Sequence, residues 1–74
     1  MASICEQVEQ GKTSWPELVG ETGECAANTI KKENKLVNTR IILEGTIIPL
    51  IYICDRVLVW VDNEGITVTT PTIG

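Results

Sequence analysis

One short segment constrains this chain more than any other, the run from Val57 to Val61, in which every residue is apolar. A strand with one face in water alternates apolar and polar residues, so an unbroken apolar run predicts a strand that is covered on both sides. The chain has 74 residues, and a chain of that size buries only roughly 60% of its unfolded surface. We therefore expect one domain, with one small core built around this strand.

A helix is predicted to begin after Thr22, which is a good N-cap residue. Its apolar stripe, Ala26 and Ile30, is narrow. Gly23 at the first helical position costs up to about 1 kcal/mol relative to alanine. We therefore expect this helix to depend on packing against the rest of the domain.

Two more strands are predicted on either side of the apolar run. Residues 39–44 are β-branched and apolar, which favours a strand. Residues 66–70 alternate and end at Pro71, which is typical of a short edge strand. Residues 1–14 are polar, without sustained periodicity, and predict a loose arm.

The residue types present exclude several classes of function. The chain has no histidine and three cysteines, so it lacks a Ser/His or Cys/His nucleophile pair and cannot complete a tetrahedral zinc site. We therefore expect no enzyme activity, no metal and no cofactor. The net charge of −4 argues against nucleic acid as a partner, because binding to phosphates needs clustered lysine and arginine.

Neither a membrane span nor a secretion signal is predicted. The longest strongly apolar run, residues 47–54, contains Pro49 and is far shorter than the roughly 20 residues of a membrane span. Residues 1–10 lack the basic and apolar regions of a secretory signal. We expect no membrane partner, and the compartment, cytoplasmic or extracellular, stays open.

The same apolar run, residues 47–54, connects the two strongest strand predictions and is unusual for a surface loop. One interpretation is a further buried strand, but Pro49 removes a backbone donor and so small a chain has little interior left to cover it. The other interpretation is an exposed apolar segment that binds a protein with an apolar pocket.

Several motifs follow one another in a fixed order from about Lys12 to the C-terminus. They are Ser14-Trp15-Pro16-Glu17-Leu18-Val19-Gly20, Glu33-Asn34, Gly45-Thr46, Cys54-Asp55-Arg56-Val57, Val59-Trp60-Val61-Asp62 and Ile73-Gly74. Together they resemble the potato inhibitor I family of serine protease inhibitors. The resemblance implies an α/β (α+β) miniature, with one helix packed on a small mixed sheet, two parallel central strands and an extended, exposed protease-binding loop. It also implies a domain over residues 12–74, preceded by a flexible arm over residues 1–11.

The resemblance further implies that the bond between Leu50 and Ile51 is the reactive bond. Leu50 would be the residue that enters the S1 pocket of the protease (P1), and it suits chymotrypsin-like or subtilisin-like enzymes because it offers no cation to a trypsin-like pocket. The implied protease-binding loop consists of Thr46, Ile47, Ile48, Pro49, Leu50, Ile51, Tyr52 and Ile53.

The sequence departs from the family at the residues that support this loop. Relatives commonly hold the loop with two arginines, which bond to a threonine at P2 and to an acidic residue after the reactive bond. Arg56 matches the first arginine, but Leu58 stands at the second, Pro49 at P2 and Ile51 after the bond. We therefore expect an inhibitor that is weaker or more easily cleaved than a typical relative.

The cysteines leave two alternatives. The resemblance implies a disulfide between Cys5 and Cys54, with Cys25 left free on the solvent side of the helix. The alternative is three reduced thiols, as in a cytosolic protein. We expect a monomer, and Cys25 offers a route to dimerisation.

Two functions are compatible with these features. The first is inhibition of a serine protease by a loop that is inserted like a substrate. The alternative is an inactive or weak member of the same family, which binds another protein through its apolar loop.

Overall fold

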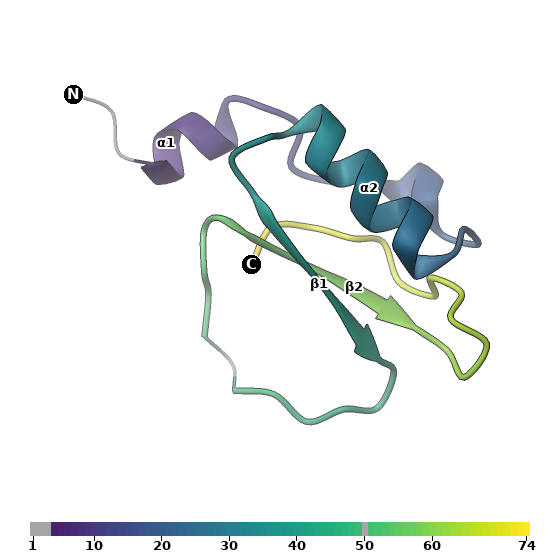
Figure 1. Cartoon of the computed structure of the whole chain (residues 1–74). Coiled ribbons are helices and arrows are strands. Elements are labelled where there is room, and N and C mark those ends of the chain that lie inside the picture. Colours follow the sequence, from purple (N-terminus) through teal and green to yellow (C-terminus); the bar gives the residue numbers. More distant parts are fainter. Residues whose placement is uncertain (1–3, 50) are drawn as a thin grey trace.

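The computed structural model describes residues 4–49 and 51–74 of the chain. Its elements are α1 (Ile4–Glu9), a single 3-10 turn η1 (Pro16–Leu18), α2 (Gly23–Glu33), β1 (Asn38–Leu43) and β2 (Arg56–Val61). The two strands are parallel, and their register pairs Asn38 with Arg56 at one end and Leu43 with Val61 at the other. Helix α2 packs on both strands, while the loop between the strands extends away from the helix (Figure 1).

Helix α2 begins where its sequence predicts. Its N-cap, Thr22, accepts a hydrogen bond from the backbone amide of Cys25, 3.2 Å from the side-chain oxygen. Ala26 and Ile30 are fully buried, so the narrow apolar stripe faces the core. The prediction that this helix depends on packing agrees with the burial of Gly23 at its first position.

Strand β2 separates two environments. Val57, Val59 and Val61 are buried, whereas Leu58 and Trp60 are only partly covered. Complete cover on both faces was expected, and the difference arises because α2 packs on one face while the other lies on the side of the loop. The core consists of Val8, Trp15, Leu18, Ala26, Ile30, Val37, Val57, Val59 and Val61.

Antiparallel bridges extend this parallel pair into a small mixed sheet. Val57 pairs with Ile73, and Val61 pairs with Thr67. The prediction of an edge strand over residues 66–70 is wrong, because this segment makes isolated bridges, to Val61 and to Thr22, and no continuous ladder.

The N-terminal segment also differs from its prediction. A loose arm was expected over residues 1–14, but residues 4–9 form helix α1. Val8 from this helix is fully buried in the core. A single buried valine gives no periodic apolar pattern, which is why the sequence did not predict the helix.

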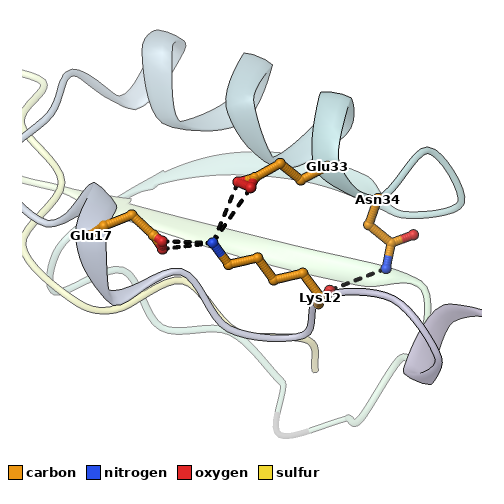
Figure 2. A network of polar contacts seen from close by, with 4 residues as sticks. All are labelled: Lys12, Glu17, Glu33 and Asn34. Atoms are coloured by element: carbon orange, nitrogen blue, oxygen red, sulfur yellow. Dashed lines mark hydrogen bonds and ion pairs between the residues drawn. The ribbon is translucent and has the colours of Figure 1, made fainter.

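A group of polar contacts joins this N-terminal segment to the end of α2 (Figure 2). The side-chain amide of Asn34 donates to the carbonyl oxygens of Val8 at 3.0 Å and Lys12 at 3.2 Å. Lys12 forms ion pairs with Glu17 at 2.7 Å and with Glu33 at 3.4 Å. The hydrogen bond with Glu17 raises the pKa of Lys12 and lowers the pKa of Glu17.

No helix in the described part of the chain combines the length and the apolar character that a membrane span needs.

Candidate functional site

The connection between β1 and β2, residues 44–55, is the candidate site. Two adjacent parallel strands need a crossover of about a dozen residues, which usually contains a helix. Here the described residues of the crossover form neither helix nor strand. Because so short a segment must return along the whole length of the sheet without a helix, it runs as an open loop (Figure 1).

Apolar side chains of this loop project into solvent. Ile47 is 96% exposed, Tyr52 is 65% exposed and Ile51 is 60% exposed. A solvated loop gains nothing from such residues, so their exposure indicates a surface for a partner. The alternative of a further buried strand over residues 47–54 is therefore wrong for the described residues.

The described residues of the predicted loop are exposed to solvent, with one exception. Thr46, Ile47, Pro49, Ile51, Tyr52 and Ile53 are exposed, and Ile48 is half-buried. Leu50, the predicted P1 residue, lies outside the described residues. Its two neighbours in the chain are joined by a hydrogen bond, in which the backbone amide of Ile51 donates to the carbonyl oxygen of Pro49 at 2.9 Å.

The two ends of the loop are fixed by backbone bonds. At its start, Gly45 has a φ of 90°, a value that glycine adopts without strain. The amide of Thr46 then donates to the carbonyl oxygen of Leu43 at 3.1 Å, which closes a turn after β1. At its end, the amide of Asn38 donates to the carbonyl oxygen of Asp55 at 2.7 Å.

Arg56 connects the loop to the C-terminal segment. Its Nη2 donates to the carbonyl oxygen of Ile51 at 2.8 Å, and its Nε donates to the carbonyl oxygen of Gly74 at 3.0 Å. The amide of Gly74 in turn donates to the carbonyl oxygen of Arg56 at 2.8 Å. The ring of Tyr52 lies so close to Gly74 that an added Cβ would meet it at 3.4 Å.

These contacts clarify how the loop is supported. With Pro49 and Ile51 at the predicted support positions, no side-chain acceptor is present there, so Arg56 bonds to a backbone oxygen instead. The contact of Tyr52 with Gly74 was not predicted from the sequence, because it joins residues that are far apart in the chain.

A disulfide joins Cys5 of α1 to Cys54 near the end of the loop, with 5.3 Å between their Cα atoms. This is the pair that the family resemblance implied, and Cys25 is free and exposed. The disulfide fixes the C-terminal part of the loop to the N-terminal helix.

A hollow of about 390 Å³ lies between the loop and the sheet. We call it the loop hollow. Arg40, Ile42, Arg56 and Leu58 line it from the strands, and Thr46 and Pro49 line it from the loop. Within residues 4–49 and 51–74, no group of three or more cysteine, aspartate or glutamate side chains is placed to hold a metal ion.

Comparisons with known proteins agree with this geometry. The sequence model of the Potato inhibitor I family matches residues 6–74. The "Glu S.griseus protease inhibitor" of Momordica charantia is 46% identical over 88% of this chain and 96% of its own length. The "Trypsin/subtilisin inhibitor" of Amaranthus caudatus is 44% identical over 85% of this chain and 91% of its own length.

A solved structure gives the same result for the fold. The crystal structure of the bitter gourd trypsin inhibitor superimposes with a TM-score of 0.86 and 49% identity, over 88% of this chain and 96% of that one.

Proposed function

Because the chain belongs to the potato inhibitor I family, a family of serine protease inhibitors, we propose that it inhibits a serine protease by presenting residues 46–53 like a substrate. Leu50 is the P1 residue, and the bond between Leu50 and Ile51 is the reactive bond. The single observation that carries this proposal is an exposed apolar loop that is fixed at its base by a disulfide and by Arg56.

This arrangement supports inhibition through the entropy of binding. A flexible peptide loses conformational freedom when a protease holds it extended, and a loop that is already fixed loses less. If the protease cleaves the reactive bond, the new amine stays close to the acyl-enzyme, so religation competes with hydrolysis. The inhibitor itself needs no catalytic group.

The residue at position 50 sets the expected target. A leucine fills an apolar S1 pocket, whereas the acidic pocket of a trypsin-like enzyme selects a cation. Loop residues 46–53 carry no charge at all. We therefore propose chymotrypsin-like or subtilisin-like targets, although the names of several relatives refer to trypsin.

The same loop has few side-chain contacts that hold it. At the expected support positions stand Pro49, Ile51 and Leu58, whose side chains have no polar group. Among the described residues, Arg56 supplies the side-chain hydrogen bond to the backbone of loop residues 46–53. We propose that the complex is weaker, or the loop more quickly cleaved, than in a typical relative. A subnanomolar inhibition constant with no slow cleavage after Leu50 would contradict this part of the proposal.

The experiment is a titration of chymotrypsin, subtilisin, elastase and trypsin with the chain and with two variants. Leu50→Lys should lose affinity for chymotrypsin by about a hundredfold and gain it for trypsin, because the lysine removes an apolar contact and adds the cation that trypsin selects. Leu36→Lys makes the same change at an exposed residue outside the loop and should alter neither affinity.

Two outcomes would count against the proposal. Unchanged inhibition of chymotrypsin by Leu50→Lys would mean that Leu50 is not P1. Failure of the unmodified chain to inhibit any of the four proteases would favour the alternative, a family member that binds another protein through its apolar loop.

A further inference from the structure

Both arginines of this chain line the loop hollow. The sequence contains two arginines, Arg40 and Arg56. They come from different strands, β1 and β2, so the sheet brings them together. In a chain with a net charge of −4, this is a local concentration of positive charge.

The register of the sheet explains the placement. Arg40 pairs with Leu58, and Arg56 pairs with Asn38, so the two arginines are diagonal neighbours. Paired residues of parallel strands share a face, and residues two apart on one strand share it as well. Both arginines therefore lie on the face opposite the buried valines of β2. Strand spacing and rise put their Cα atoms about 8 Å apart, within reach of a common ligand.

The hydrogen-bond donors of these side chains are only partly used. Arg56 donates through Nε to the terminal backbone oxygen of Gly74 and through Nη2 to the carbonyl oxygen of Ile51. The side chain of Arg40 is exposed and makes no hydrogen bond or ion pair with any part of the chain that the structure describes. No aspartate or glutamate lines the loop hollow. Two guanidinium groups thus share a concave surface that no aspartate or glutamate side chain lines.

We propose that the loop hollow binds a small multivalent oxyanion of the phosphate class between Arg40 and Arg56. Guanidinium groups present several N–H donors in a planar fork that matches such oxygens. Thr46 lines the loop side of the same hollow, and a threonine hydroxyl group is a further donor. The bound anion connects β1, β2 and the start of the loop, and it supplies the acceptor that Pro49 and Ile51 do not.

This inference does not depend on protease inhibition, and its test uses no protease. The intact chain is titrated with inorganic phosphate at constant ionic strength, with sodium chloride as the compensating salt, while NMR follows the Nε–H signals of Arg40 and Arg56. Both signals should shift along one saturable curve. Amide exchange at Thr46 and Ile48 should slow at saturation, because the anion holds the start of the loop.

Three variants separate a site from simple charge attraction. Arg40→Met keeps a long apolar side chain and removes donors that bond to nothing else in the described chain, so the fold should be unaffected. It should weaken phosphate binding about tenfold or more, which is the loss expected when one of two charge-assisted contacts disappears. Arg56→Met should weaken binding at least as much. Lys32→Met removes one exposed positive charge from α2 and should leave the binding curve unchanged.

Either of two results would overturn the inference. One is the absence of a saturable shift in the unmodified chain. The other is an equal loss of binding in Arg40→Met and Lys32→Met, because phosphate would then respond only to total charge. If the chain inhibits no protease and still binds phosphate through both arginines, the proposed function fails and this inference stands.

Discussion

Gly23 begins α2 at a point where the helix touches the sheet. A Cβ added there would lie 2.8 Å from Cγ1 of Val61 and 3.2 Å from Cγ2 of Ile41. Gly23→Ala should therefore lower the free energy of unfolding by about 1–2 kcal/mol, since the overpacking outweighs the gain of up to about 1 kcal/mol in helix propensity. Urea unfolding would measure the change.

The exposed residue Asn28 of the same helix provides the control for Gly23→Ala. Asn28→Ala should raise stability by about half a kcal/mol, from propensity alone. A stabilising effect of Gly23→Ala would show that the sheet moves to accept the methyl group.

Single residues were predicted well where the controlling interaction is local. Thr22 was identified as the N-cap because the bond it accepts comes from three residues along the chain. Gly23 was seen only as a cost to the helix, because its reason for being glycine lies on two strands that are distant in sequence. The diagonal placement of Arg40 and Arg56 was missed for the same reason, since it depends on strand register.

At the scale of elements, Asn34 joins α1 and the following segment to the end of α2. Its buried side chain donates to Val8 and Lys12 and accepts from the amide of Leu36. Asn34→Ala should lower the free energy of unfolding by about 2–4 kcal/mol, because three bonds are lost and the buried carbonyl oxygen of Val8 keeps the amide of Gly11 as its remaining donor. Chemical denaturation would measure this loss.

Hydrogen exchange would show where Asn34→Ala acts. The amides of α1 should lose protection more than those of β2, because the side chain of Asn34 bonds to Val8 of α1 and to no residue of β2. Equal loss of protection in both elements would contradict the local role of Asn34.

Prediction of the elements succeeded where a run of β-branched and apolar residues forms a strand, and it failed where isolated long-range contacts hold a segment. Strands over residues 39–44 and 57–61 were predicted within one residue of β1 and β2. Helix α1 was missed because Val8 is a single anchor. The strand over residues 66–70 was wrongly predicted because alternation describes residues that make separate bridges to Thr22 and Val61 equally well.

For the whole molecule, the disulfide is the largest single covalent constraint. It connects cysteines 49 residues apart, and a closed loop of that size stabilises a fold by about 4 kcal/mol in the chain-entropy account. The double variant Cys5→Ser/Cys54→Ser should lose about this much free energy of unfolding, a large share of what a small domain has.

Cys25→Ser is the matched control, since Cys25 is free and exposed. Its stability should stay within about 0.5 kcal/mol of the unmodified chain. A loss below about 1 kcal/mol in the double variant would mean that the core and the contacts of Asn34 hold α1 without the disulfide.

The disulfide also decides what the chain becomes after the proposed bond is cut. Cys5 lies before that bond and Cys54 after it, so the two pieces remain one covalent molecule whose mass has grown by one water. Rejoining on the protease is then intramolecular for the inhibitor, because the disulfide keeps the new ends at a high effective concentration however dilute the inhibitor is. The product of cleavage is a second form of the same molecule, and the protease interconverts the cut and intact forms without two separate pieces having to meet in solution.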